Sequence, residues 1–339
     1  MRAKCFLIAL VAFAMVGGLG AHSRAAEPLT IRQGFAVPTA TMSPMIFTDP
    51  SILRHYGKSY IVEPIHFAGT SPELTAIATG DVDIVTISYS TLPLAVLNAH
   101  IDDLRVIADG EQDGVHGHFS SPYLVRNDST IKSVEDLKGK VIGVNAFGDA
   151  VDIAARAMFL RHGLVAQRNY TIVEGAFPAL GPMLLDGKVQ LIGDVPPFIY
   201  APKLQHATHT LFTMKDAVGP TQLIMLAARE SFLQKHRAAL DDFFEDLVRG
   251  TRWMLDPANR KQALALAARF AKVPPERLGD YYLTKDDRYR DPDCLPNVEA
   301  LQRNVDAQRK LGFLKADFDV HKYVDTSFVE RAAKRLRGK

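Results

Sequence analysis

The alternation of short apolar segments with helical segments is the feature that most restricts the fold of this chain. The strand-like segments "LTIRQGF", "YIVEPIHF", "VDIVTIS" and "LRVIADG" alternate with helical ones such as "SPELTAIATG" and "TLPLAVLNAH". Such alternation over roughly 80 residues indicates βαβ units on a mainly parallel sheet. A second α/β module of about the same size begins near Tyr123. After Leu233 the apolar residues recur at helical spacing, so the rest of the chain is predicted to be mostly helical.

Two α/β modules followed by a helical segment predict two lobes with a cleft between them. Lobe 1 is expected to contain residues 27–118 and 228–339, and lobe 2 residues 119–227. The chain would cross to lobe 2 around 117–124 and return around 222–229. Small ligands prefer such clefts and the carboxyl ends of strands that face them, so the cleft is the expected ligand site.

Residues 1–26 have the composition of a secretory signal peptide. Arg2 and Lys4 form a basic start before the apolar run "CFLIALVAFAMVGGLG", and cleavage is expected after Ala25 or Ala26. The apolar run is short for a membrane span, although an uncleaved anchor is the alternative interpretation. The segment therefore predicts export to the periplasm.

Charge and cysteine content exclude several classes of function. Cleavage removes three basic residues and leaves 37 against 38 acidic ones, a formal charge of −1. There is no basic stripe, so no nucleic-acid partner is expected. Cys5 leaves with the signal peptide, and Cys294 alone can form neither an internal disulfide nor a cysteine-based zinc site.

The sequence contains little that indicates catalysis. It lacks a G-x-S-x-G elbow, an H-E-x-x-H pair, a Walker loop and a G-x-G-x-x-G segment. In "GVHGH", His116 and His118 would face the same side of an extended chain, as a metal requires, but no further ligand with convincing spacing completes a site. We therefore predict no catalytic residues, no metal and no cofactor. Ligand contact by His118, near the first crossing, is the remaining possibility for this pair.

Several longer segments resemble one family. They are "GTSPELTAIATGDVDIVTIS", "STIKSVEDLKGKVIGVN", "MLLDGKVQLIGDVPPFIY" and "RKLGFLKADFDVHKYVDTSFVERA". They are similar to the solute-binding proteins of ABC importers for nitrate, sulfonates, taurine and thiamine-precursor pyrimidines, the NitT/TauT or NMT1-like family. The resemblance extends over residues 28–332.

This resemblance implies an α/β periplasmic-binding-protein fold of type II, with a mainly parallel sheet flanked by helices in each lobe. A monomer would close its lobes on a small organic solute, whether sulfonate- or taurine-like, carboxylate or pyrimidine-like. It would deliver that solute to an ABC permease in the inner membrane. A periplasmic enzyme on the same scaffold and a ligand-sensing receptor are the alternatives.

In relatives the ligand contacts the loops that follow the strands of each lobe. Carried onto this chain and joined by the histidine above, the expected ligand-binding residues are Thr39, Thr41, Ser43, Thr70, Ser71, Ser88, Tyr89, Ser90, His118, Asn145, Phe147, Gly148, Asp149, Asp194 and Phe198. Each also has a structural alternative. Ser71, for example, is the expected N-cap of its helix, and Phe198 could equally belong to the core.

The loop in "VNAFGDAVDIAARAMF" bears on the charge of the solute. Asp149 is the expected N-cap of the following helix, and with Asp152 three residues later it resembles a capping box. Relatives commonly have Ser or Thr after the glycine, which leaves the backbone N–H groups open to an anion. The expected ligand loops also contain no Arg or Lys. An amine-bearing zwitterion or a neutral heterocycle is therefore favoured, with small organic anions as the family default.

Overall fold

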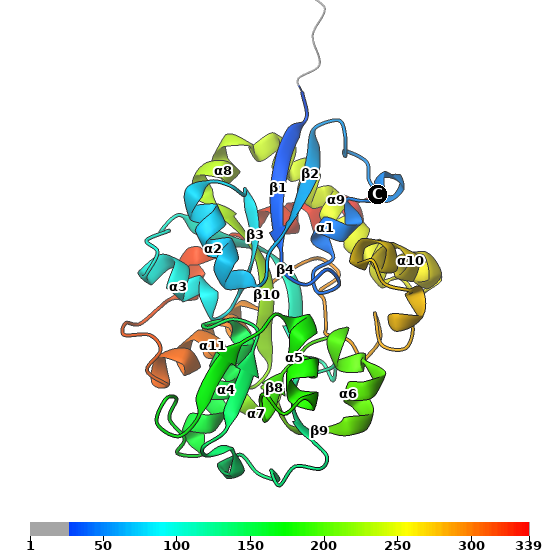
Figure 1. The fold of residues 1–339 in the computed structure, drawn as a ribbon. Helices are drawn as coiled ribbons and strands as arrows, with labels where there is room; N and C mark the ends of the chain where they lie inside the picture. Colours follow the sequence, from blue (N-terminus) through cyan, green and yellow to red (C-terminus); the bar gives the residue numbers. More distant parts are fainter. Residues whose placement is uncertain (1–26, 339) are drawn as a thin grey trace, which may run out of the picture.

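The computed structural model describes residues 27–338, which form two five-stranded sheets, one above the other in Figure 1. The expected signal peptide lies outside the described residues. The first sheet has the order β2-β1-β3-β10-β4. Its strands are β1 (Leu29–Phe35), β2 (Tyr60–His66), β3 (Ile84–Ser88), β4 (Leu104–Asp113) and β10 (Thr221–Arg229).

The second sheet repeats this arrangement with the order β7-β6-β8-β5-β9. Its strands are β5 (Pro122–Arg126), β6 (Val141–Val144), β7 (Thr171–Glu174), β8 (Leu191–Gly193) and β9 (Thr208–Thr213). β1 pairs in parallel with β2 and β3, as β6 does with β7 and β8. β10 runs antiparallel to β3 and β4, and β5 runs antiparallel to β8 and β9. The prediction of two lobes, each with a mainly parallel sheet, is confirmed.

The second chain crossing lies earlier than the sequence pattern suggested. β10 pairs with β3 and β4 from Thr221 to Arg229, so residues 221–227 belong to the first sheet and not to lobe 2. The chain therefore returns just before Thr221, rather than around 222–229. β10 is buried between two neighbouring strands, which explains its nearly continuous apolar sequence.

Twelve α-helices in the described chain flank the sheets. They are α1 (Ser43–Ile46), α2 (Thr70–Thr79), α3 (Thr91–Leu97), α4 (Ala150–Arg161), α5 (Phe177–Leu185), α6 (Pro202–Ala207), α7 (Met214–Val218), α8 (Glu230–Lys235), α9 (Arg237–Leu255), α10 (Arg260–Ala271), α11 (Val298–Lys310) and α12 (Ser327–Arg337). Short 3-10 helices occupy Pro50–Ile52, Glu135–Leu137, Phe198–Tyr200, Pro257–Asn259, Pro275–Arg277 and Val320–Tyr323. As predicted, residues 230–338 form helices and loops without a further named strand.

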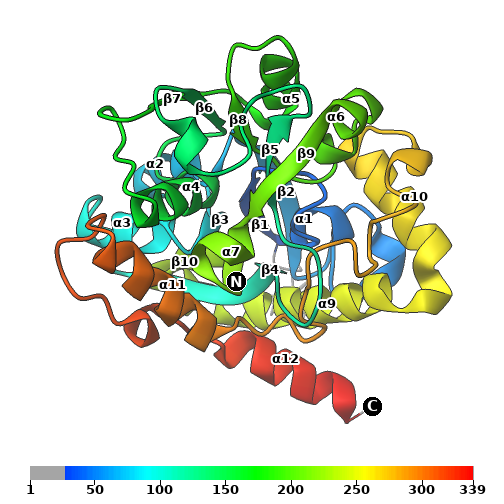
Figure 2. The same ribbon diagram turned by 90° about the horizontal axis from the view of Figure 1, so that it is seen from below.

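The alternation of side chains along each strand divides the core into two layers. In β10, Met225 and Ala227 pack with α2, α3 and lobe 2, whereas Leu226 and Ala228 pack with α9 and α12. Helices α9, α10 and α12 thus cover one face of the first sheet, whereas α11 packs on the other, and α12 runs alongside α9 in Figure 2. One core cluster continues from the first lobe into the second, so the lobes are packed against each other.

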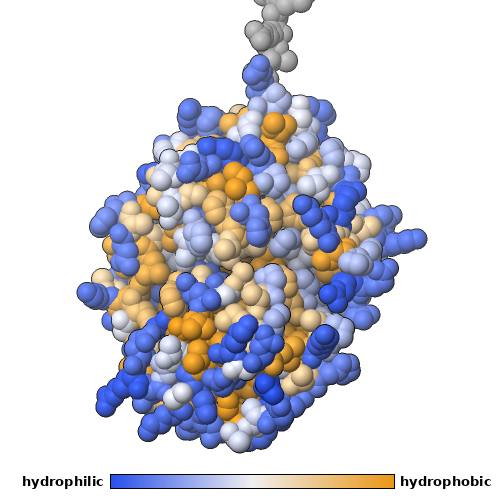
Figure 3. Space-filling model, viewed as in Figure 1, coloured by the Kyte–Doolittle hydropathy of each residue, from blue (hydrophilic) through white to orange (hydrophobic). Residues whose placement is uncertain are grey.

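The surface of the molecule agrees with this two-lobed arrangement. Hydrophilic residues dominate the outline of the face in Figure 3, and hydrophobic residues reach the surface in its middle, where the lobes meet. Within residues 27–338, no helix is both long and apolar enough to cross a membrane.

Candidate functional site

A cavity lies between the two lobes, where the strand ends and helix starts of both meet. With the lobes closed as they are here, the cavity has a volume of about 60 Å³, which leaves room for a few water-sized groups. Its walls are Ala36, Val37, Ala40, Thr41, Gly69, Thr70, Thr86, Ser88, Glu111, Asn145, Asp149, Ala150, Val151, Phe177, Val195, Leu223, Ile224 and Arg288. Both lobes contribute, and most of the lining is apolar with a few polar groups among it.

Five of the expected ligand-binding residues line this cavity: Thr41, Thr70, Ser88, Asn145 and Asp149. Thr41 follows β1, Ser88 ends β3, and Thr70 begins α2, all in the first lobe. Asn145 follows β6 and Asp149 precedes α4, both in the second lobe. The loops that follow parallel strands therefore supply polar groups from both sides of the cleft.

The carboxylate of Asp149 does not cap its own helix, so the predicted capping box is wrong. Asp149 is the N-cap of α4 by position, but its carboxylate accepts no hydrogen bond from that helix. Oδ1 instead accepts from the Ser71 backbone N–H at 3.1 Å, the Ser71 hydroxyl at 2.5 Å and the Thr70 hydroxyl at 3.0 Å. These donors belong to the start of α2 in the other lobe. The N-cap of α2 is Gly69, and not Ser71 as predicted.

Further expected residues also contact one another across the cleft. The Ser90 hydroxyl donates to the Gly148 carbonyl at 2.8 Å, and the Tyr89 hydroxyl donates to the Ala150 carbonyl at 3.3 Å. Both tie the end of β3 to the loop before α4. In this closed arrangement, several residues expected to contact a solute hold the lobes together instead.

Three expected residues lie away from the cavity. The Ser43 hydroxyl is buried and hydrogen-bonded to the Gln33 side chain at 2.7 Å. Thr39 is buried, and its carbonyl accepts from Arg290 Nη2 at 3.0 Å. The Phe147 side chain is 48% exposed. None of the three is among the residues that line the cavity.

His118 lies in a separate surface depression. Its Nδ1 is 3.0 Å from the Asp287 carbonyl, and its ring meets the Tyr289 ring edge-on, as the His116 ring does. Burial lowers the pKa of His118. In the part of the chain that the structure describes, no cluster of three His, Cys, Asp or Glu is placed to hold a metal ion.

Asp194 and Phe198 line a neighbouring cavity that shares one wall, Phe177, with the first. The Phe198 ring stacks parallel to the Phe177 ring, with 6.2 Å between the centroids. Asp194 Oδ1 accepts from the Val195 N–H at 2.8 Å. Burial raises the pKa of Asp194 to about 8. These two residues therefore lie beside the inter-lobe cavity and do not line it.

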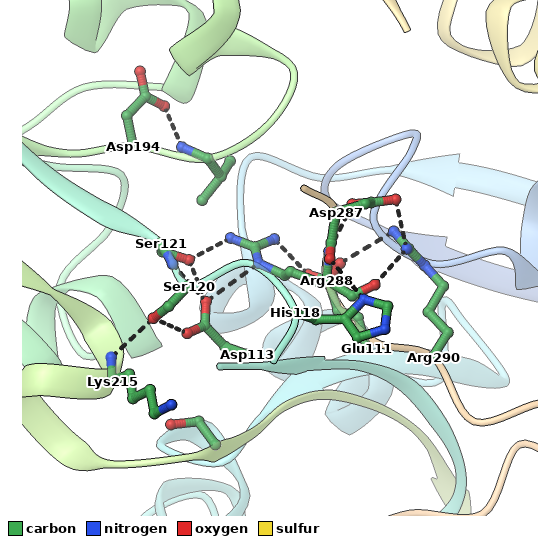
Figure 4. Close-up of polar contacts among 12 residues, drawn as sticks. Glu111, Asp113, His118, Ser120, Ser121, Asp194, Lys215, Asp287, Arg288 and Arg290 are labelled. Carbon is green, nitrogen blue, oxygen red and sulfur yellow. Dashed lines mark hydrogen bonds and ion pairs between the residues drawn. The ribbon is translucent and has the colours of Figure 1, made fainter. Parts of the chain in front are cut away.

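Sequence reasoning missed two charged residues that do line the cavity, Arg288 and Glu111. Arg288 Nη1 donates to Glu111 Oε1 at 2.7 Å, Nη2 donates to the Ser121 hydroxyl at 2.6 Å, and Nε is 3.4 Å from Asp113 Oδ2 (Figure 4). The expected ligand loops do lack a cation, but a cation from another part of the chain lines the cavity. Arg288 reaches it from the C-terminal segment, and acidic partners balance its charge.

A second buried acid, Glu73, lies in the first turn of α2. Its carboxylate accepts from the backbone N–H of Thr86 at 2.6 Å and from the Thr86 hydroxyl. Burial, together with the nearby Asp149, raises the pKa of Glu73 to about 8. Within the described residues no ion pair to Glu73 is present, so its charged form is stabilised by hydrogen bonds alone.

These features define a two-lobed α/β protein of the periplasmic-binding-protein class, with a small-molecule cavity between the lobes. A family model described as NMT1/THI5 like matches residues 65–260. The chain belongs to this family, as its resemblance to NMT1-like proteins predicted. No curated protein matches the sequence.

Solved structures share the fold at low sequence identity. The alkanesulfonate-binding protein SsuA from Xanthomonas axonopodis pv. citri, bound to MOPS, superposes with a TM-score of 0.67 at 17% identity, covering 89% of this chain and 100% of that one. The periplasmic nitrate-binding protein NrtA from Synechocystis PCC 6803 gives 0.73 at 14% identity, covering 92% and 90%. The desulfurization enzyme DszB gives 0.63 at 15% identity, covering 91% and 100%. The fold thus carries both binding and catalysis.

Proposed function

We propose that this protein is the periplasmic solute-binding component of an ABC importer. It would capture a small organic solute between its lobes and deliver it to a permease in the inner membrane, acting as a monomer. One observation carries the proposal: three residues that line the inter-lobe cavity have buried polar atoms, Thr41 Oγ1, Asn145 Oδ1 and Arg288 Nε, with no hydrogen-bond partner in residues 27–338. Buried polar groups are normally paired, so a bound solute is the natural partner.

The proposal is tested by purifying the exported protein under native conditions and analysing what it retains by mass spectrometry. We expect a small molecule at about one equivalent, which raises the melting temperature when it is added back to stripped protein. The mass of the exported chain also reports whether residues 1–26 have been removed. Solute that is chemically converted during incubation would contradict a pure binding role.

Filling the cavity should abolish solute binding. Ala36 is a half-buried residue of the cavity wall, and Ala36→Phe places a large ring in the space that the solute needs. We expect at least a 100-fold loss of affinity in calorimetric titration with the retained solute. Ala99→Phe, at an exposed position outside the cavity, is the matched control. Equal affinity of both variants would place the solute elsewhere.

An enzyme on the same scaffold is the alternative that DszB represents. Cys294 is a poor nucleophile here, because it is buried away from the inter-lobe cavity and burial raises the pKa of its thiol. His118 does not line the cavity either. Binding without turnover is therefore favoured. Turnover that is lost on replacing His116, His118 or Asp149 would support the enzyme instead.

A sensory receptor would share the cavity and the lobe closure but report to a membrane protein other than a permease. Reconstitution with a candidate ABC permease and its ATPase separates the two roles. We expect solute uptake only in the presence of the binding protein.

A further inference from the structure

The geometry points to Asp149 as a specificity-determining residue. Its carboxylate occupies the place on the start of α2 that an anionic group of a solute would take, so the cleft selects uncharged, hydrogen-bond-donating solutes over anions. This inference rests on the proposed solute-binding function and names the chemical class of the solute.

The surroundings of Asp149 are those of a bound anion. Besides the three donors from Thr70 and Ser71, the Asn145 side-chain amide donates to Oδ2 at 2.7 Å. Asp149 is only 4% exposed. All four neighbours donate, which suits an ionised carboxylate, and the start of a ten-residue helix adds its dipole. The hydrogen-bond donors at the start of α2, which could bind an anion, are thus already bound by the Asp149 carboxylate.

Gly69 provides the space for this carboxylate. A Cβ atom added at Gly69 would lie 2.5 Å from Asp149 Oδ2, a distance that side chains do not tolerate. Gly69 has φ −179° and ψ 179°, an extended conformation that any residue adopts. The backbone conformation therefore does not require glycine at position 69. The space taken by the Asp149 carboxylate does.

The loop of the second lobe is closed to anions in the same way. The Gly148 N–H donates to Asp152 Oδ2 at 2.9 Å, and the Phe147 N–H donates to Glu174. Carboxylates of the protein therefore occupy backbone donors on both sides of the cleft, at Ser71, Phe147 and Gly148, whereas no described side chain caps the first N–H groups of α4. A solute sulfonate or carboxylate would have to displace one of them and meet its negative charge.

The groups left over in the cavity suit a different solute. Glu111 pairs with Arg288 at 2.7 Å and Asp113 lies 3.4 Å from Arg288 Nε, so the charge of Arg288 is balanced within the protein, although Nε itself makes no hydrogen bond in the described chain. Asn145 Oδ1 can only accept a hydrogen bond, and Thr41 Oγ1 can accept one; both atoms are buried, and no described residue pairs with either. With the apolar walls, these acceptors match a small, uncharged molecule that carries N–H or O–H donors, such as a primary amide.

The test compares two sets of matched probes on protein from which bound solute has been removed. Each set contains an amide, a carboxylate and a sulfonate: benzamide, benzoate and benzenesulfonate in the first, and propionamide, propionate and ethanesulfonate in the second. Affinities are measured for the wild type, for Asp149→Ser and for Asp186→Ser, an exposed acid that controls for the loss of one charge. We expect Asp149→Ser to gain at least tenfold in affinity for the carboxylates and sulfonates, with no gain in the control. Within each set of probes, wherever the affinity of the wild type is measurable, the amide should bind more tightly than the carboxylate and the sulfonate. An unchanged anion affinity in Asp149→Ser, or wild-type binding of an anion above its amide, overturns the inference.

A second measurement does not depend on any ligand. Gly69→Ala should lower the melting temperature by several degrees in the wild type, because the new methyl group meets the Asp149 carboxylate. The same substitution should be nearly neutral in the Asp149→Ser background. Equal losses in both backgrounds would mean that the Asp149 carboxylate does not lie at the start of α2.

The failure of this inference can be told apart from the failure of the proposed function. A wild-type protein that retains an anion would still be a solute-binding protein, and only the proposed preference for uncharged solutes would be refuted. A protein that neither retains nor binds any solute would contradict the binding function itself.

Discussion

Replacing Arg288 by methionine is expected to destabilise the protein by about 3–5 kcal/mol, because the change strands buried carboxylates. Arg288 and Glu111 are only 4% and 2% exposed as side chains, and Asp113 is fully buried. Methionine fills much of the same volume but supplies no charge or donor. The free energy of unfolding is measured by urea denaturation at pH 7.

The matched control is Arg309→Met on the surface. Arg309 pairs with Asp317 at 3.0 Å, but the two side chains are 44% and 89% exposed. Water solvates the charge left behind, so the loss should be within about 1 kcal/mol. The double variant Glu111→Gln, Arg288→Met removes one of the stranded charges and should recover part of the loss. Similar losses for Arg288→Met and Arg309→Met would contradict the stabilising role of the buried pair.

The protein should lose stability as the pH rises from about 5 to 8, and Glu73→Gln should remove the share of that loss that Glu73 contributes beside Asp194, whose pKa burial also raises to about 8. Burial raises the pKa of Glu73 to about 8, so the folded state holds a proton that the unfolded state has already released. Stability from this group is therefore fully present below its ordinary pKa and is lost as the pH passes through the raised value. The slope is at most about 1.4 kcal/mol per pH unit for one such group.

Glutamine suits this position because its amide can accept from the Thr86 N–H and donate to the Thr86 hydroxyl. Both contacts made by Glu73 are then replaced without a charge. Unfolding curves at pH 5, 6, 7 and 8 provide the measurement, and we expect Glu73→Gln to be the more stable protein at pH 8. Asp128→Asn, an exposed acid whose pKa the Arg126 guanidinium holds below its ordinary value, should leave the slope unchanged over this range. Parallel slopes for the wild type and Glu73→Gln would exclude Glu73 as the titrating group.

The two sheets could be predicted from the sequence because each strand and helix carries its own local pattern. "TQLIMLAAR" was recognisable as an apolar segment, but nothing within it states that it is inserted antiparallel between β3 and β4. That placement depends on where the chain crosses between the lobes. The strands, the helices and the two lobes could therefore be predicted from the sequence pattern, whereas the position of the second crossing could be seen only in the structure.

The site was predictable where its residues follow strands, and not where distant segments meet. Asp149 was assigned to the nearest helix, as capping rules direct, but donors 78 residues away bind its carboxylate. Arg288 is 177 residues from Glu111, in the C-terminal part of the chain that was predicted to be mostly helical. Rules based on neighbouring residues cannot detect a partner that only the folded chain brings close.

The two chain crossings have a mechanical consequence. They lie side by side, since the Met214 N–H donates to the Ser121 carbonyl at 2.8 Å and the Lys215 N–H to the Ser120 hydroxyl at 2.9 Å. Two adjoining connections form a hinge that allows the lobes to rotate about one axis and resists rotation about the others. Arg288 anchors the C-terminal segment to this hinge through Ser121. In the proposed binding cycle, opening would therefore be a rotation about one axis, and a change in one of these buried charges would alter how fast the lobes move as well as how stably they fold.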